Sequence, residues 1–236
     1  MKALVLCAGE GKRLRPLTSD RPKPMLPVGD RPLLERIILL LKEHGITDIA
    51  INLHYKPLAI VRHLGEGSRW GVHIRYSFEQ DLLGSAGAAR RLTPYLKDGP
   101  FLVFYGDLFT ELDVDRLRNA HERGKAPITM ALYEVDNPTA CGIVELDREN
   151  RVIRFVEKPK PSQVFSRLAN AGVFVVEPHV LKLVPNEVNY DFGHDLFPRM
   201  LSKGLPIQGY VIEQLLIDIG TMSNYRRAQE IALAQA

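Results

Sequence analysis

A glycine loop near the start of the chain is followed by a dense group of basic residues. The apolar run Ala3–Cys7 ends in the sequence Ala8-Gly9-Glu10-Gly11. Backbone N–H groups of such a loop can approach an anion closely, and lysine or arginine side chains neutralise its charge. The pattern therefore favours a site for a phosphate-bearing ligand over an ordinary solvated loop. The basic residues are Lys12, Arg13, Arg15, Arg21 and Lys23.

The spacing of this loop excludes two common phosphate-binding motifs. The Walker pattern requires Ser or Thr after Gly-Lys, but Arg13 stands there, and Leu6 occupies the place of the first glycine. The dinucleotide pattern GxGxxG fails because Leu14 stands at its last position. Prolines at positions 16, 22, 24 and 27 stiffen the segment and keep it out of a helix. We therefore expect an extended cationic loop of a different kind.

Two aspartates follow apolar stretches further along the chain. Asp107 comes after Phe101–Tyr105, and Asp218 comes after Leu215–Ile217. Open α/β sheets bind ligands at the carboxyl ends of their strands, and carboxylate oxygens suit Mg²⁺. For either aspartate taken alone, the alternative is a residue that merely caps the end of a strand.

Short apolar runs alternate with amphipathic segments through the first part of the chain. Ala3–Cys7 and Phe101–Tyr105 are continuously apolar, which is typical of strands buried on both faces. The β-α-β-α order implies a largely parallel sheet with helices on both faces. Further strands are predicted at Ile49–Leu53, Val72–Tyr76 and Ile128–Tyr133, and helices at Leu33–His44, Leu58–Leu64, Ser85–Leu92 and Val114–Arg123.

The second part of the chain has a different character. Gly142–Leu146 and Val152–Val156 flank the polar sequence Asp147–Asn150, which indicates an antiparallel hairpin. Asp191–Asp195 contains a DFG triplet, but the other kinase elements are absent, so we interpret it as a loop that leads into a helix. The remaining predictions are strands at Gly172–Val176 and Ile207–Val211 and helices near His179–Val184, Leu196–Lys203 and Ser223–Ala234.

The composition excludes several classes of protein. The 236 residues include 31 Lys and Arg against 28 Asp and Glu, a balance unlike that of a dedicated nucleic-acid binder. The longest apolar runs are far shorter than the roughly 20 residues that span a membrane. Two cysteines cannot form a disulfide framework, and the N-terminus does not resemble a signal peptide, so we expect a cytoplasmic protein. Residues 1–36 contain eight basic and four acidic residues, which concentrates positive charge in the cationic loop.

These segments resemble, in order, the signature of the sugar-1-phosphate nucleotidylyltransferases. The longest match runs from Leu6 to Val28 and includes the glycine loop and the sequence Pro22-Lys23-Pro24. Each shorter piece is weak alone, but their common order makes the resemblance specific. These pieces are Leu83–Gly87, Gly106-Asp107, Glu157–Pro159, Asn170–Gly172 and Asp218–Thr221.

The resemblance implies transfer of a nucleotidyl group from a nucleoside triphosphate to a sugar 1-phosphate, with release of pyrophosphate. Such a reaction joins two polyanions and depends on positioning and cations more than on a side-chain nucleophile. The resemblance casts Arg13 and Lys23 as catalytic and Asp107 and Asp218 as ligands of Mg²⁺. Arg15 stands at a variable position of the signature, so its role stays open.

The resemblance also assigns residues to two binding sites. Lys158 would hold the phosphate of the sugar phosphate, Glu157 and Asn170 would bond sugar hydroxyls, and the Gly142 backbone would lie against the sugar. Arg199 is a candidate for a further phosphate contact. The nucleotide would be bound by Ala8, Gly9, Gly11, Lys12, Glu79, Gly84 and Ser85.

The predicted fold class is α/β, a three-layer αβα Rossmann-like fold with a central mixed, mainly parallel sheet and a small antiparallel extension. We expect one nucleotidyltransferase domain over residues 1–236, with a nucleotide-binding half at about 1–125 and a sugar-phosphate-binding half at about 126–236. No hexapeptide repeat of a C-terminal β-helix is visible, and no nucleic acid or membrane partner is expected. Whether the protein forms a homo-oligomer stays open.

The choice of base rests on hydrogen bonds from the backbone around Ala8-Gly9 and from the Glu79–Gly87 stretch, where the Glu79 carboxylate only accepts hydrogen bonds. It suits the N1–H and exocyclic amine of guanine, or equally the N3–H of uracil or thymine. GTP with mannose 1-phosphate is slightly preferred, and UTP or dTTP with another hexose 1-phosphate follows closely. One alternative is a cytidylyltransferase for a phosphate such as phosphocholine. Another is a catalytically silent nucleotide-sugar-binding subunit, although such subunits normally lose a catalytic arginine, lysine or carboxylate.

Overall fold

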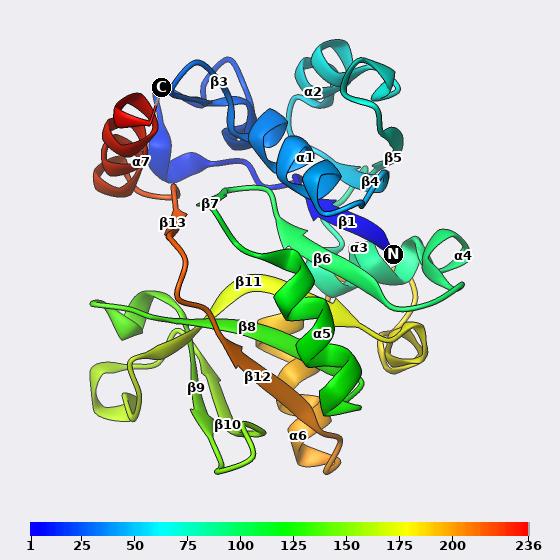
Figure 1. The fold of residues 1–236 in the computed structure, drawn as a ribbon, viewed down its shortest axis with the longest axis vertical. Helices are drawn as coiled ribbons and strands as arrows, with labels where there is room; N and C mark the ends of the chain where they lie inside the picture. The colour runs from blue at the N-terminus through cyan, green and yellow to red at the C-terminus, as the bar shows by residue number, and fades with distance from the viewer. Residues whose placement is uncertain (236) are drawn as a thin grey trace. The chain divides into compact units, whose positions relative to one another are not determined.

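The computed structural model describes residues 1–235, and these form two compact units (Figure 1). Unit 1 gathers residues 1–82, 104–112 and 214–235, and unit 2 gathers residues 83–103 and 113–213. Unit 1 is therefore built from three separate segments of the chain. The two units do not follow the division near residue 125, and the assignment of one ligand to each half of the chain stays a prediction.

Unit 1 contains a run of parallel strands. β1 (Lys2–Leu6) pairs with β4 (Asp48–Leu53), and β4 pairs with β5 (His73–Phe78), both in parallel. β6 (Phe101–Tyr105) neighbours β1 on its other side and contributes its last two residues to this unit. The interior of β1 and nearly all of β4 are buried, as the continuously apolar runs predict for parallel strands covered on both faces.

The helices of unit 1 place apolar residues at helical spacing on their buried faces. α1 (Leu33–Glu43) buries five aliphatic side chains, and Gly45 follows it with φ +71°, a conformation that ends helices readily. α2 (Pro57–Leu64) begins with proline, which suits a first helical turn. α7 (Met222–Ala234) is capped by the Thr221 side chain, which accepts from the Asn224 N–H at 3.2 Å.

Two short antiparallel pairs in unit 1 are not predicted by the sequence pattern. β2 (Pro27–Val28) pairs with β3 (Arg31–Pro32), and β7 (Leu108–Thr110) pairs with β13 (Leu216–Asp218). Strands of two or three residues are too short to show a periodicity. Both pairs nevertheless position residues of the candidate site.

Unit 2 is built on mixed strand pairing. β8 (Ile128–Glu134) pairs antiparallel with β11 (Leu168–Val176) and parallel with β12 (Ile207–Val211). β9 (Gly142–Leu146) pairs antiparallel with β10 (Val152–Glu157) and with β11. The predicted hairpin is confirmed, and the Asp147 carboxylate closes its turn by accepting from the N–H groups of Glu149 and Arg151, both at 2.8 Å.

The helical segments of unit 2 are α3 (Gly84–Arg91), α4 (Thr93–Leu96), α5 (Val114–Gly124) and α6 (Phe197–Ser202). A 3₁₀ helix at Pro178–Leu183 occupies the place predicted for a short helix, and a π-helical turn at Phe192–Leu196 leads into α6. Four phenylalanines pack together in the core of this unit, with ring centroids 4.7–5.9 Å apart. They are Phe155, Phe174, Phe192 and Phe197.

The predicted mixed α/β class, with parallel strands and an antiparallel addition, is confirmed. Each helix and strand predicted from periodicity is present within a few residues of its predicted bounds. Among residues 1–235, no helix combines the length and the apolar character that crossing a membrane requires.

The fold predicts different reactivity for the two cysteines. Cys7 follows β1 and is only 2% exposed, whereas Cys141 is partly exposed. Burial raises the pKa of the Cys7 thiol well above its usual range, the Asp107 charge raises it further, and Lys23 opposes both. Since the thiolate is the reactive form, an aromatic disulfide reagent should label only Cys141 in the folded protein. Unfolding in denaturant should expose the second thiol.

The control is Cys141→Ser, which should show no fast-reacting thiol until it is unfolded. Fast labelling of that folded variant, followed by absorbance, would contradict the burial of Cys7.

Candidate active site

The glycine loop turns back toward Lys23. Gly11 has φ +66°, and a Cβ atom there would lie 3.0 Å from the Thr18 methyl group and 3.2 Å from Lys23 Cβ. The Thr18 hydroxyl donates to the Gly11 carbonyl at 2.9 Å. Ala8 is buried and Gly9 is exposed with open space around it, while the Lys12 side chain is 67% exposed. Gly11 thus brings the loop against the backbone that carries Lys23.

Lys23 forms an ion pair with Asp107 inside unit 1. The Lys23 side chain is 14% exposed and that of Asp107 is 19% exposed, so water screens the pair poorly. Burial alone lowers the pKa of Lys23. The charge and hydrogen bond of Asp107, together with the charge of Asp218, outweigh burial and raise the pKa above its ordinary value. Lys23 is therefore held as a cation.

Asp107 and Asp218 are brought together by the short β7–β13 pair. In its register Asp218 stands opposite Leu108, and the Ile219 N–H donates to the Asp107 carbonyl at 3.0 Å. Burial and the charge of Asp107 raise the pKa of Asp218, while Lys23, the Gly220 N–H and Arg13 oppose this rise. The Asp107 carboxylate is thus close enough for its charge to act on Asp218.

Glycines on either side of the cluster leave room for it. A Cβ atom at Gly106 would lie 2.8 Å from the Leu6 carbonyl oxygen, so the residue before Asp107 must be small. A Cβ atom at Gly220 would lie 2.8 Å from both Arg13 Nη2 and Asp218 Oδ1. The Arg13 guanidinium therefore lies beside Asp218. The structure gathers the four residues that the resemblance casts as catalytic or metal-binding, Arg13, Lys23, Asp107 and Asp218, in one unit.

Glu79 ends a buried hydrogen-bond chain in the same unit. Its Oε1 accepts from the side-chain amide of Asn52 at 2.8 Å, and Asn52 Oδ1 accepts from the Cys7 N–H at 2.8 Å. Glu79 and Asn52 are only 5% and 3% exposed. Asn52 was missed at the sequence level, although a polar residue inside the apolar strand Ile49–Leu53 is the signal that could have found it. Through Asn52, these hydrogen bonds connect Cys7, directly before the glycine loop, with the Glu79 carboxylate.

Glu157 and Gly142 are neighbours in unit 2. They stand opposite each other in the β9–β10 register, and a Cβ atom at Gly142 would lie 2.5 Å from Glu157 Oε2. Burial and the charge of Asp191 raise the pKa of Glu157, against the effects of Lys158 and His194. The Lys158 ammonium lies 3.9 Å from Glu157 Oε1 and is 69% exposed.

Lys158 and Asn170, two of the predicted sugar-phosphate residues, each lie at an irregular point of the backbone. Lys158 has φ +45°, an uncommon conformation for a residue with a Cβ atom, and its N–H donates to the Cys141 carbonyl at 3.0 Å. Asn170 begins a register shift in β11, where its side-chain oxygen accepts from the Gly172 N–H at 2.9 Å. Bulges of this kind redirect side chains next to active sites.

The other predicted residues are found in two places. Gly84 and Ser85 open α3 in unit 2. Arg15 is exposed in unit 1, and Arg199 is exposed on α6, where it donates to the Tyr190 hydroxyl at 3.4 Å. The roles of Arg15 and Arg199 stay open.

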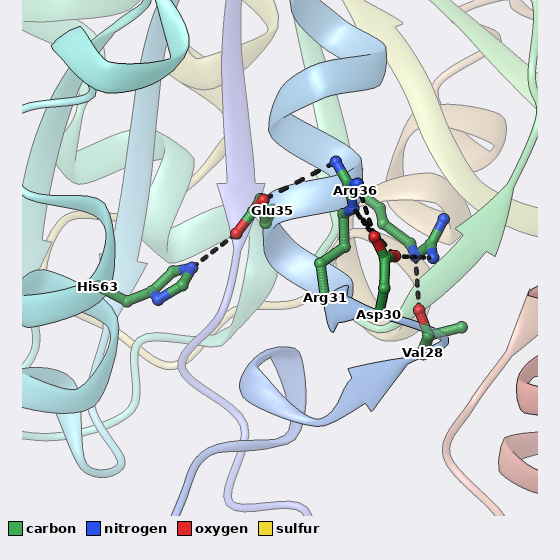
Figure 2. A network of polar contacts seen from close by, with 6 residues as sticks. All are labelled: Val28, Asp30, Arg31, Glu35, Arg36 and His63. Carbon is green, nitrogen blue, oxygen red and sulfur yellow. Dashed lines mark hydrogen bonds and ion pairs between the residues drawn. The ribbon is translucent and has the colours of Figure 1, made fainter. Parts of the chain in front are cut away.

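The β2–β3 hairpin, which follows Lys23 in the chain, is held by α1 on one side. Arg36 donates to the Val28 carbonyl at 2.6 Å and to Asp30 Oδ1 at 2.8 Å (Figure 2). A hydrogen bond from Arg31 lowers the pKa of Asp30. Figure 2 also shows Glu35 joining this group to His63 at 2.8 Å.

Helix α7 holds the same hairpin on the other side. Gln229 accepts from the Gly29 N–H at 2.7 Å and donates to the Pro27 carbonyl at 2.8 Å. The Tyr225 hydroxyl donates to the Pro27 carbonyl at 2.8 Å. At the start of the helix, the Asn224 amide donates to the Asp218 carbonyl at 2.8 Å. Helix α7 therefore ties the backbone at Asp218 to the segment that follows Lys23.

Comparisons with known proteins agree with this geometry. Residues 2–235 match the family described as nucleotidyl transferase. A UTP–glucose-1-phosphate uridylyltransferase of Synechocystis sp. is 33% identical over 97% of this chain and 62% of its own length. A mannose-1-phosphate guanylyltransferase of Mycobacterium tuberculosis is 34% identical over 95% and 62%. The chain thus spans about three fifths of these relatives.

A solved structure shares the fold. It is that of a Bacillus anthracis protein assigned as a glucose-1-phosphate thymidylyltransferase, in complex with sucrose. The match has a TM-score of 0.89 at 25% identity, over 99% of this chain and 95% of that chain.

We expect Gln229→Leu to loosen the hairpin that follows Lys23. The change removes a donor and an acceptor for backbone groups, and two such hydrogen bonds contribute about 2 kcal/mol together. In a protein of this size that corresponds to a fall in Tm of about 6 °C. Differential scanning calorimetry measures the fall. The exposed neighbour Glu230→Leu is the matched control, and an equal change in both variants would refute the bracing role of Gln229.

We expect Glu157→Gln to stabilise the folded protein more at neutral than at acidic pH. Because the folded-state pKa of Glu157 is raised, the folded state binds its proton more tightly than the unfolded state. Wild-type stability therefore falls as pH rises through the window that begins near the ordinary glutamate pKa of about 4.3. Glutamine carries no charge to bury. The Tm difference, measured from about pH 4 to about pH 8, should grow with pH, and a constant or shrinking difference would contradict the assignment.

Proposed function

Because the chain belongs to the nucleotidyl transferase family, we propose that it transfers a nucleotidyl group from a nucleoside triphosphate to a sugar 1-phosphate. The observation that carries this proposal is the cluster of the partly buried Lys23, Asp107 and Asp218 with the exposed Arg13. The names of two relatives include glucose 1-phosphate and mannose 1-phosphate, which supports a sugar 1-phosphate as the acceptor. A cytoplasmic location is part of the same proposal.

The reaction needs no nucleophilic side chain. An oxygen of the sugar phosphate attacks the α-phosphorus in line, and the bond from that phosphorus to the oxygen bridging to the β-phosphorus breaks. Pyrophosphate leaves with the electron pair of that bond. Arg13 can bind two oxygens of the triphosphate at once, and Lys23 supplies a compact positive charge. Both cations stabilise charge that develops on the phosphates during transfer.

The donor set fits a divalent cation. Asp107 and Asp218 offer hard oxygen ligands, and the pKa of Asp218 is raised by its burial and by the charge of Asp107. Asp107 and Asp218 would hold the cation, and its charge would offset the repulsion between the two carboxylates. When bound, Mg²⁺ would neutralise phosphate charge and orient the triphosphate.

The acceptor would be bound by residues of unit 2. Lys158 presents an exposed ammonium suited to the sugar-bound phosphate, and Glu157 and Asn170 offer hydrogen-bonding groups to sugar hydroxyls. At Gly142 the absence of a side chain leaves the Glu157 carboxylate its space. We take these four residues as the sugar-phosphate site.

Glu79 is our choice for reading the base. Asn52 donates to one of its carboxylate oxygens and so fixes the orientation of a buried acceptor. An acceptor of this kind suits the N1–H and amine of guanine, so GTP with mannose 1-phosphate is preferred. UTP or dTTP with another hexose 1-phosphate follows, since uracil and thymine also offer an N–H.

We expect Lys23→Ala to lower kcat about 10²- to 10³-fold, the usual effect of removing one group that stabilises developing charge. Pyrophosphate release, coupled to a colorimetric phosphatase assay, measures the loss, and circular dichroism checks the fold. Lys203→Ala, which removes an exposed lysine, is the control. Near-normal turnover by Lys23→Ala would refute the assigned role.

The substrates need a separate experiment. The wild-type protein with Mg²⁺ is assayed with each of the four nucleoside triphosphates against glucose, mannose, N-acetylhexosamine and heptose 1-phosphates, and against phosphocholine. GTP with mannose 1-phosphate should give the fastest release. Turnover of CTP with phosphocholine alone would replace the proposal with the cytidylyltransferase alternative.

A further inference from the structure

The segment Asp191–Asp195 has no part in the function proposed above, although its sequence stands out. It forms a π-helical turn that leads into α6, and its Phe192 packs among the buried phenylalanines of unit 2. π-Helical turns are rare and frequently occur at functional sites. The segment contacts the start of α3 on one side and the Glu157 carboxylate on the other.

On one side, Asp191 holds the start of α3. Its Oδ1 accepts from the Ser85 hydroxyl at 2.7 Å and from the Ser85 N–H at 3.0 Å. The Ser85 hydroxyl in turn accepts from the Phe192 N–H at 2.9 Å. A carboxylate at the N-terminus of a helix also interacts favourably with the helix dipole. Asp191 thus supplies a capping group for α3 from a position 106 residues away.

The backbone of Tyr190 completes this attachment. Its carbonyl accepts from the N–H groups of Ala86 and Gly87, both at 2.9 Å, and its N–H donates to the Leu83 carbonyl at 2.8 Å. Gly84 has φ +71°, and a Cβ atom there would lie 2.6 Å from the Tyr190 carbonyl oxygen. Tyr190 and Asp191 together therefore hold the segment Leu83–Gly87 through backbone and side-chain hydrogen bonds.

On the other side, Gly193 shapes the place of the Glu157 carboxylate. A Cβ atom at Gly193 would lie 2.6 Å from Glu157 Oε2. The same oxygen would lie 2.5 Å from a Cβ atom at Gly142. Gly142 and Gly193 come from different segments, and the lack of a side chain at both leaves room for the Glu157 carboxylate in its observed position. Asp195 steadies the turn by accepting from the Asp191 N–H at 2.7 Å.

We propose that Asp191–Asp195 is a positioning segment that fixes the Leu83–Gly87 loop through Asp191 and the Glu157 carboxylate through Gly193. This inference rests on the proposed function, in which Glu157 contacts the sugar, and on the nucleotide contact that the sequence resemblance assigns to Gly84 and Ser85. Asp191 and Gly193 belong to the same short segment, so displacing the whole segment changes the binding of both substrates, whereas a side chain added at Gly193 acts on Glu157.

The test compares Asp191→Ala with Asp191→Asn. Both Ser85 contacts reach the single oxygen Oδ1, which the asparagine side chain can replace, so Asp191→Asn should keep the loop in place. Asp191→Ala loses the acceptor and should raise KM for both substrates about 10-fold, the factor that corresponds to about 1.4 kcal/mol each. A role in stability alone would lower the fraction of active protein and leave both KM values unchanged, which would overturn the proposal.

The second variant, Gly193→Ala, acts on the Glu157 side alone. It should raise KM for the sugar 1-phosphate while leaving the calorimetric affinity for a triphosphate with a non-hydrolysable α,β-bridge unchanged. Equal losses with Asp191→Asn and Asp191→Ala would overturn the proposal, and so would weaker nucleotide binding by Gly193→Ala.

Hydrogen exchange distinguishes failure of this inference from failure of the proposed function. Amides 83–92 should exchange faster in Asp191→Ala than in the wild type or Asp191→Asn, whether or not the protein turns over any substrate pair. Unchanged protection of these amides would overturn the positioning role, even in an active enzyme.

Discussion

The arrangement of unit 1 depends on the mutual compensation of Lys23 and the carboxylates of Asp107 and Asp218. A partly buried ammonium or carboxylate is unfavourable alone, and a pair of carboxylates is worse. Placed together, the two signs offset one another, and Arg13 adds a second cation beside Asp218. The same compensation holds Lys23 as a cation near fixed oxygens, and a polyanionic ligand requires a fixed cation in its site. The cluster is therefore both a structural and a chemical feature.

These charges come from distant parts of the chain, and short elements hold them in place. The Lys23–Asp107 pair joins residues 84 positions apart. The β7–β13 pair sets Asp218 beside Asp107, and α7 connects the Asp218 backbone with the hairpin after Lys23. Fixed donors and charges stabilise a transition state without reorganising when it forms. The prolines of the cationic loop contribute to the same rigidity, because they limit the conformations available to the segment.

The sequence predicts helices and strands that have a recognisable residue pattern. It does not predict features that depend on a single contact between distant segments. Helical spacing predicts α1, continuous apolar runs predict β1 and β4, and two apolar runs around a polar turn predict the β9–β10 hairpin. The sequence does not predict the β7–β13 pair, whose strands have three residues each. It also does not connect Asn52 with Glu79 or Ser85 with Asp191, since such hydrogen bonds depend on how distant segments pack. The charged residues were found through motif order, and their meeting in one cluster became visible only in the structure.

The two units hold most of their candidate residues by different means. In unit 1 the charged groups of Arg13, Lys23, Asp107 and Asp218 compensate one another, whereas Glu79 is held by a buried hydrogen bond from Asn52. In unit 2 the Glu157 carboxylate and the Leu83–Gly87 loop are set by glycine space, backbone hydrogen bonds and aromatic packing. Contacts of that kind depend little on ionic strength and strongly on shape. Shape is what discriminates a sugar or a base, whereas phosphate binding relies chiefly on charge.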